Sequence, residues 1–252
     1  MDPTQGSSRT PRRATLSVIV PVYNERATIR EILQRVAARP EVDELVVVDD
    51  CSTDGTGAVL RDEQAAGWPS LRSASRSLPR VTFLQHEVNQ GKGAALRTGF
   101  EAATCDVFLT QDADLEYDPA DYDKLMLPIY DGRADAVYGS RFAGYPRRVL
   151  FFWHSLGNKM LTMLSNMLCN LNLTDMETGY KAIRKEMVRS MVLQSNRFGI
   201  EPEITAKVFK RRYRVYEVPI SYDGRGYDEG KEITWRDGIV ALWVLLKYRF
   251  TE

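Results

Sequence analysis

Two aspartates one residue apart, Asp112 and Asp114, directly follow an apolar run and can present hard oxygen ligands to one divalent cation. Mg²⁺ or Mn²⁺ held in this way keeps coordination positions open for phosphate oxygens. Glu116 adds a third candidate oxygen donor. An acidic loop is often only solvated, so its position after a predicted buried strand is what favours a metal site at Asp112, Asp114 and Glu116.

A second candidate for chemistry is the sequence Asn89-Gln90-Gly91-Lys92-Gly93, which precedes a predicted helix. Glycines let the backbone approach an anion, a helix N-terminus favours negative charge, and Lys92 supplies a cation. The sequence is not a Walker A motif, and no GxGxxG motif follows the first predicted strand. Taken alone, it fits an ordinary helix start as well as an anion site.

Alternating strand and helix patterns position these residues. Apolar runs predict strands at 16–20, 44–48, 81–85, 106–110 and 136–138, and periodicity predicts helices at 28–38, from 56 onward and at 93–103. Apolar strands that alternate with helices predict an α/β fold with a parallel sheet covered on both faces. Such sheets bind ligands beyond the carboxyl ends of their strands. We therefore expect four polar clusters to converge on one edge: residues 23–25, 49–54, 89–92 and 112–116.

The remaining segments have other patterns. Residues 1–14 are polar and predict a disordered tail rather than a secretory signal, and 62–80, rich in Ser, Arg, Ala and Pro, predict a mobile surface loop. Residues 148–173 and 235–250 predict aromatic-rich helices. The second helix has one apolar face, with Lys247 and Arg249 off it, which predicts either packing on the sheet or an interfacial helix in lipid. That face comprises Trp235, Ile239, Leu242, Trp243, Leu246 and Phe250.

Composition limits the classes of protein. A length of 252 residues suits one α/β domain over 15–252, and a formal net charge of zero gives no basic field for nucleic acid. The cysteines Cys51, Cys105 and Cys169 lack CxxC spacing, which indicates reduced thiols. No apolar run reaches the roughly 18 residues of a spanning helix. His86 and His154 have no second ligand at metal spacing, so we interpret both as ordinary residues.

Taken in order, five motifs resemble those of glycosyltransferase family 2, within its dolichyl-phosphate mannose synthase-like, or polyprenyl-phosphate sugar synthase, branch. The resemblance covers about 15–250 and implies a GT-A fold, a Rossmann-like, mostly parallel sheet with helices on both faces. It also implies an inverting transfer from a UDP- or GDP-sugar to a polyprenyl phosphate. The motifs are PVYNE at 21–25, VDDCSTDG at 48–55, NQGKG at 89–93, DAD at 112–114 and GSRF at 139–142.

The resemblance also implies roles for single residues. On the donor side, the residues framing or reading the nucleotide are Pro21, Tyr23, Glu25 and Asp50, and those meeting the metal and diphosphate are Lys92, Asp112 and Asp114. Glu116 stands where the mannose synthases carry Gln, which leaves its role as a metal ligand open. Arg141 is expected to meet phosphate, Asp175 to lie near the sugar, and Arg225 and Lys231 to close over the phosphates.

Three functions remain open. With a lipid phosphate acceptor, whose second pKa is about 6, no strong general base is needed. A glycosyltransferase of the same fold that acts on a soluble or polysaccharide hydroxyl would need one, with Asp175 or Glu177 as candidates. A sugar-nucleotide nucleotidyltransferase is less favoured, because Tyr23, Asn24 and Glu25 stand where many of those enzymes carry a glycine-rich loop. The lipid hypothesis places the chain at the cytoplasmic face of a membrane, peripherally bound, with a separate membrane partner protein as an option.

Overall fold

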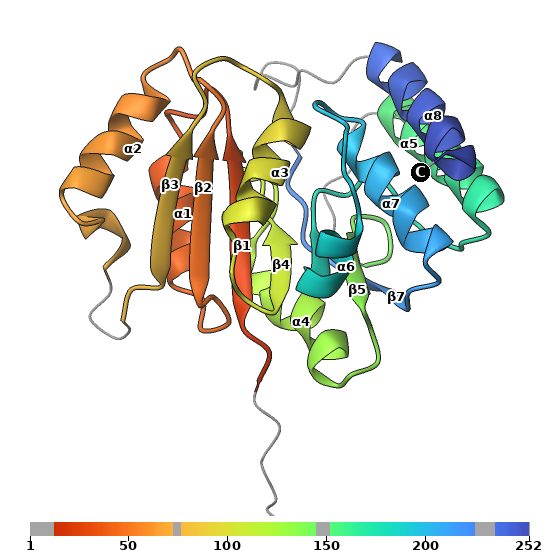
Figure 1. The fold of residues 1–252 in the computed structure, drawn as a ribbon, viewed down its shortest axis with the longest axis horizontal. Coiled ribbons are helices and arrows are strands. Elements are labelled where there is room, and N and C mark those ends of the chain that lie inside the picture. Colours follow the sequence, from red (N-terminus) through yellow and green to blue (C-terminus); the bar gives the residue numbers. More distant parts are fainter. Residues whose placement is uncertain (1–12, 73–76, 145–151, 225–234, 252) are drawn as a thin grey trace, which may run out of the picture.

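The computed structural model describes residues 13–72, 77–144, 152–224 and 235–251 (Figure 1). Within them lies a seven-stranded sheet of order β3-β2-β1-β4-β6-β5-β7, in which β6 runs antiparallel to both of its neighbours and the other pairs are parallel. This arrangement confirms the predicted α/β fold with a mostly parallel sheet. The strands are β1 (Leu16–Val22), β2 (Glu44–Asp49), β3 (Arg80–Gln85), β4 (Val107–Thr110), β5 (Ala136–Ser140), β6 (Lys181–Arg184) and β7 (Val215–Pro219).

Helices cover both faces of the sheet, and Figure 1 shows α3 in front of it and α1 behind. Two short 3₁₀ turns, η1 (Pro69–Leu71) and η2 (Pro119–Asp121), connect elements. The predicted strands and helices of the first half are all present, with ends that differ by at most two residues. The helices are α1 (Ile29–Ala37), α2 (Thr56–Ala65), α3 (Lys92–Ala102), α4 (Tyr122–Tyr130), α5 (Phe152–Cys169), α6 (Lys185–Ser190), α7 (Ile200–Lys210) and α8 (Trp235–Phe250).

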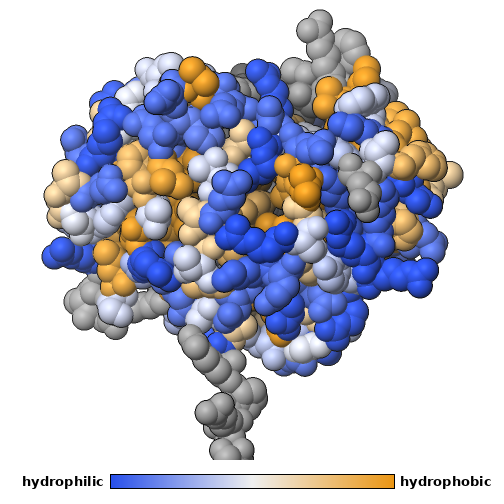
Figure 2. Space-filling view, viewed as in Figure 1, coloured by the Kyte–Doolittle hydropathy of each residue, from blue (hydrophilic) through white to orange (hydrophobic). Residues whose placement is uncertain are grey.

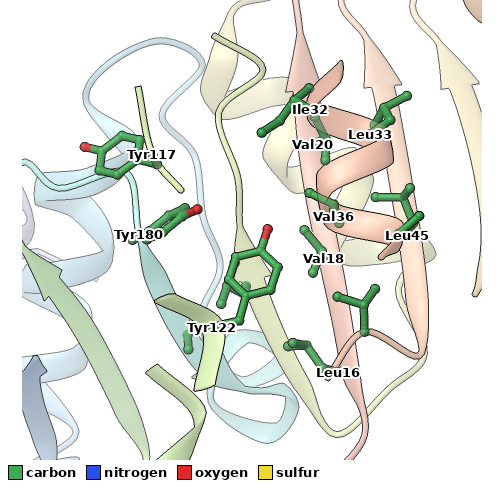
Figure 3. Close-up of a cluster of buried hydrophobic side chains, with 14 of the residues drawn as sticks. Leu16, Val18, Val20, Ile32, Leu33, Val36, Leu45, Tyr117, Tyr122 and Tyr180 are labelled. Carbon is green, nitrogen blue, oxygen red and sulfur yellow. The ribbon is translucent and has the colours of Figure 1, made fainter. Parts of the chain in front are cut away.

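The central strands are buried on both faces, which explains their continuous apolar sequences. Successive side chains of a strand point to opposite faces. Val18 and Val20 accordingly pack in the core that contains α1 (Figure 3), while Ile19 packs in the core that contains α3. The carboxyl ends of these strands are thereby fixed by two cores, and the loops that follow them start from rigid positions.

The prediction of a mobile loop over 62–80 is wrong for most of that segment. Helix α2 continues to Ala65, and η1 follows with Trp68 and Leu71 buried in the first core. Ser70 also donates a hydrogen bond from its hydroxyl to Glu63, at 2.8 Å. Two apolar side chains in a polar stretch are thus enough to anchor it, whereas 73–76 lie outside the described residues.

Helices α5, α7 and α8 pack against one another beside the sheet (Figure 1). Helix α5 is shorter than the predicted 148–173: it ends at Cys169, and Asn170 follows with a left-handed φ of 48°. Helix α8 occupies 235–250, with Val244, Leu245 and Tyr248 buried and Ile239 and Trp243 exposed. Among the described side chains of α8, the apolar residues therefore divide between a buried side and an exposed side. Among the described residues no helix has the length and hydropathy to cross a bilayer.

Candidate active site at the carboxyl edge of the sheet

The loops after β1 and β2 are joined by hydrogen bonds. Asn24 accepts from the Thr53 amide at 2.8 Å, and the Glu25 amide donates to the Thr56 hydroxyl at 3.1 Å. Pro21 is buried within β1, whereas Tyr23 is 41% exposed and presents its ring at the edge of the sheet. The first two polar clusters therefore form one surface that includes a partly exposed aromatic residue, which can stack on a planar base.

Asp50 connects this surface to the loop before α3. It is only 2% exposed and accepts hydrogen bonds from the amides of Gln90 and Gly91 at 2.9 and 2.6 Å. His86 Nδ1 lies 2.7 Å from Asp50 Oδ1, and His86 Nε2 lies 2.9 Å from the Thr98 hydroxyl. His86 thus connects Asp50 to α3. Asp50 holds the loop before α3 in place, and its role in reading a base stays a prediction.

The start of α3 needs both of its glycines. Gly91 has a φ of 93°, and a Cβ at Gly91 or Gly93 would overlap backbone oxygens of the segment 195–197. Lys92 lies between them, with its Nζ 2.7 Å from Asp112 Oδ1 and 3.0 Å from Glu201 Oε1. Burial lowers the pKa of Lys92, but these two carboxylates raise it more, so the pKa stands well above its usual value. The ammonium is therefore a fixed positive charge at the carboxyl edge of β4.

The loop that carries Asp112 is fastened to the segment before β6. A Cβ at Gly179 would overlap Asp112 Oδ2, so this carboxylate needs the bare glycine backbone beside it. The Gly179 amide also donates to the Tyr117 hydroxyl at 3.0 Å. Tyr117 stacks on Tyr180 with ring centroids 4.6 Å apart, in the cluster that continues to Tyr122 (Figure 3). The metal candidate Asp112 is thus held by rigid neighbours from two loops.

The donor set fits a divalent cation that takes further ligands from a substrate. The described residues contain no cluster of three or more Asp, Glu, His or Cys that could hold a metal alone. Mg²⁺ in phosphate-transfer sites is commonly held by one or two carboxylates, with phosphate oxygens and water completing its shell. Asp112 and Asp114 suit that arrangement. Glu116 suits it less, because its Oε2 accepts a hydrogen bond from the Tyr222 hydroxyl at 2.7 Å.

Arg141 and Asp175 form a buried, bidentate ion pair. Arg141 Nε lies 2.6 Å from Asp175 Oδ2, and a second guanidinium nitrogen lies 2.7 Å from Oδ1. Asn158 of α5 contacts both side chains. Asp175 is fully buried and its two oxygens have partners. This geometry favours a role in orienting Arg141, whose guanidinium also lies over the Tyr222 ring at 5.2 Å.

Three charged residues beneath the site did not stand out in the sequence as a group: Lys181 and Glu201, which are buried, and Glu177, which is partly buried. Lys181 donates to the carbonyls of Met176 and Thr178 at 3.0 and 2.5 Å and so fixes the segment before β6. Burial lowers the pKa of Lys181 and raises that of Glu177. Glu201 was missed, although an acidic residue in the first turn of a helix, two residues after the glycine that precedes the helix, is a usable signal.

Arg225 and Lys231, predicted to close over the phosphates, lie outside the described residues, as does most of their loop. The segment that leads into it is fixed, because the Asp223 amide donates to the Glu116 carbonyl at 2.9 Å. The structure therefore brings together the predicted residues at Asp50, Lys92, Asp112 and Asp114 and places Arg141 with Asp175.

Tyr117 is close enough to Asp112 and Arg141 that both act on its pKa, which is raised chiefly by burial.

Comparison with known proteins identifies relatives over most of the chain. The family description "Glycosyl transferase family 2" matches residues 17–192. A dolichol-phosphate mannosyltransferase of Pyrococcus furiosus is 32% identical over 86% of this chain, and the chain spans 58% of that protein's length. An undecaprenyl-phosphate mannosyltransferase of Micrococcus luteus is 31% identical, with 84% of this chain and 85% of that protein covered.

A solved structure has a similar fold. The glucosyl-3-phosphoglycerate synthase of Mycobacterium tuberculosis, in complex with Mn²⁺, uridine diphosphate and phosphoglyceric acid, matches with a TM-score of 0.70. The match covers 95% of this chain and 80% of that one, at 21% identity. That protein is a glycosyltransferase, so the likeness supports the GT-A fold that the sequence motifs implied.

Proposed function

The chain belongs to glycosyl transferase family 2 and is a glycosyltransferase, and from this premise we propose that it moves a sugar, with inversion, from a nucleotide-sugar to a polyprenyl phosphate at a membrane surface. The observation that carries the proposal is the arrangement at the carboxyl edge of the sheet. Lys92 forms an ion pair with Asp112, and Arg141 forms an ion pair with Asp175. Relatives named for transfer to dolichol phosphate and undecaprenyl phosphate support the acceptor class.

The chemistry follows from charge. An oxygen of the lipid phosphate forms the new bond to the anomeric carbon, and the bond from that carbon to the nucleoside diphosphate breaks, so the diphosphate leaves with the bonding electrons. A divalent cation bound by Asp112 and Asp114 would supply charge neutralisation at the diphosphate. Lys92 and Arg141 contribute fixed positive charges whose positions are set before the reaction, which is where electrostatic catalysis has its largest effect.

The acceptor needs little help from a base. A phosphate monoester is largely a dianion at neutral pH, because its second pKa is about 6. This agrees with the site, where both oxygens of Asp175 are engaged by Arg141 and Asn158. We therefore assign Asp175 to positioning Arg141 rather than to proton transfer.

Replacing Asp50 by alanine is expected to weaken nucleoside diphosphate binding by about 10- to 100-fold. A hydrogen bond to a charged group contributes on the order of 1.5–3 kcal/mol, and Asp50 also holds the amides of Gln90 and Gly91. Calorimetric titration of UDP and GDP, on protein whose fold is checked by circular dichroism, measures the change. Unchanged affinity in a folded variant would remove Asp50 from the nucleotide site.

Helices α5 and α8 provide the membrane-facing surface of the proposal. Their outer sides carry exposed apolar side chains, which we call the α5/α8 face, and Figure 2 shows apolar groups gathered where these helices lie. Apolar and aromatic side chains on an interfacial helix insert into the headgroup boundary of a bilayer. Lys247 lies beside Trp243, 5.2 Å from its ring. The face comprises Phe152, Trp153, Leu156, Met160, Met163, Met167, Ile239, Val240, Trp243, Leu246 and Phe250.

The α5/α8 face connects to the catalytic edge. Asn158, which contacts Arg141 and Asp175, lies on α5. A groove of about 420 Å³ lies along the same helix, and both polar and apolar side chains line it: Lys159, Thr162, Met163, Asn166, Met167, Leu171, Leu173 and Thr174. A lipid phosphate at Arg141 would therefore lie next to a helix that also carries part of the α5/α8 face. The unpaired cysteines suit the cytoplasmic face of the membrane.

Substitution of Trp243 by glutamate is expected to weaken binding to vesicles with anionic lipid by at least about 10-fold, because it replaces an inserted aromatic ring with a charge. Trp243 is 60% exposed, so the fold should be retained. Leu127→Glu, an exposed apolar residue of α4 and so away from the face, is the matched control. Equal vesicle binding by both variants and the parent protein, measured by co-sedimentation, would show that the α5/α8 face does not meet lipid.

The direct test of the proposed function is a panel of labelled UDP- and GDP-sugars, each with and without polyprenyl phosphate. We expect label to enter the lipid fraction for at least one donor, and only when the lipid is present. 3-Phosphoglycerate, a soluble acceptor, serves as the comparison, since the similar M. tuberculosis structure holds phosphoglyceric acid. Transfer to it but not to the lipid phosphate would overturn the proposed acceptor.

A further inference from the structure

We propose that Lys92 is an internal counter-ion of Asp112 that a divalent cation has to displace, and that Glu201 is the positioning residue that then holds Lys92 for the donor diphosphate. The proposal rests on the metal and donor assignment of the proposed function. Its starting point is the position of the Lys92 ammonium, 2.7 Å from Asp112 Oδ1 and 3.0 Å from Glu201 Oε1. The ammonium is thus shared between a candidate metal ligand and a carboxylate of α7.

Asp112 has little freedom to serve both cations at once. Its Oδ1 faces Lys92, and its Oδ2 lies against the backbone of Gly179. A divalent cation at Asp112 would stand beside the ammonium, and like charges at such a distance oppose each other. A nucleoside diphosphate relieves this opposition because its oxygens accept from the ammonium and also coordinate the metal. Metal binding alone is therefore disfavoured, while metal binding together with the diphosphate is not.

Glu201 has the capacity to keep Lys92 when Asp112 releases it. Its side chain is buried in the first turn of α7, and its Oε2 has no hydrogen-bond partner. A buried carboxylate oxygen without a partner is costly, so a second contact from the released ammonium is favourable. The segment before α7 is fixed, because Glu203 accepts from the amides of Gln194 and Ser195 at 2.9 and 2.7 Å. Glu201 is thereby held in one place while Lys92 changes partner.

The experiment measures Mn²⁺ binding in the absence of nucleotide, by electron paramagnetic resonance of free Mn²⁺, in the full chain, three test variants and one control variant. Lys92→Met should tighten Mn²⁺ binding by about 5- to 10-fold, because Asp112 then has no ammonium partner that Mn²⁺ must displace. Glu201→Gln should weaken it by a similar factor, since Lys92 then pairs with Asp112 alone. In the double variant, Glu201→Gln should add less than about a 2-fold change, because Glu201 acts through Lys92. Lys210→Met, at the far end of α7, is the control and should change nothing.

A structural ion pair without exchange predicts other results. The proposal is overturned if the Mn²⁺ affinity of both single variants changes in the same direction or does not change. It is also overturned if Glu201→Gln still weakens Mn²⁺ binding in the Lys92→Met background. Thermal unfolding is recorded for every variant, and Lys92→Gln repeats the measurement if the methionine variant does not fold. Mn²⁺ binding with UDP or GDP present is the separate arm. If the parent protein binds no Mn²⁺ even then, the metal assignment of the proposed function fails, and the counter-ion proposal fails with it.

Discussion

Replacing Asp112 by asparagine is expected to lower the rate of sugar transfer by at least about 100-fold, the equivalent of several kcal/mol of transition-state stabilisation. The carboxylate contacts both Lys92 and the backbone at Gly179. The amide keeps the shape of the side chain but loses the charge that a divalent cation needs. Asp114→Asn should have an effect of the same order, and EDTA should abolish transfer until Mg²⁺ or Mn²⁺ is added back.

Asp123→Asn is the matched control for this prediction. Asp123 is an exposed aspartate at the start of α4, and its loss should leave the transfer rate within about 2-fold of the parent protein. Initial rates at saturating donor and acceptor give the comparison. Full activity of Asp112→Asn and Asp114→Asn, or full activity in EDTA, would rule out the metal assignment.

Replacing Asp175 by alanine is expected to reduce the free energy of unfolding by about 3–5 kcal/mol, because it leaves the Arg141 guanidinium buried without its counter-charge. The carboxylate accepts from the Arg141 backbone amide as well as from its side chain, so both the charge and the local backbone depend on it. Transfer should fall too, since Arg141 loses the partner that orients it. Urea unfolding measures the first effect.

The chain offers a control that separates burial from ion pairing. Asp135 binds Arg214 through two guanidinium nitrogens in the same manner, but here the arginine side chain is 56% exposed, against 16% for Arg141. Exposed pairs contribute about 0–1 kcal/mol, so Asp135→Ala should cost far less. Equal losses of stability for Asp175→Ala and Asp135→Ala would mean that the Arg141 pair is not the buried anchor of the site.

Most of the first half could be predicted from the sequence because its signals are local. Strands β1 and β2 are continuous apolar runs, and polar residues start at the point where each ends. In a parallel sheet those points share one edge, so the meeting of Asp50 with the segment 89–91, and of Lys92 with Asp112, follows from topology alone.

The remainder depends on contacts that the sequence does not display. Lys181 and Glu201 are ordinary charged residues in sequence, and only the packing of β6 and α7 buries them beneath the site. Tyr117, Tyr122 and Tyr180 come from three segments and meet through stacking. Trp68 and Leu71 likewise anchor a stretch whose average composition indicated a loop.

The most direct test of the central claim is phosphorus NMR of the protein with a nucleotide-sugar, polyprenyl phosphate and Mg²⁺. Sugar transfer to the lipid phosphate predicts that the phosphomonoester signal of the lipid is replaced by a phosphodiester signal, with one equivalent of nucleoside diphosphate released. A phosphomonoester signal that stays unchanged while nucleoside diphosphate is released to a hydroxyl acceptor would contradict the account, as would the appearance of inorganic pyrophosphate.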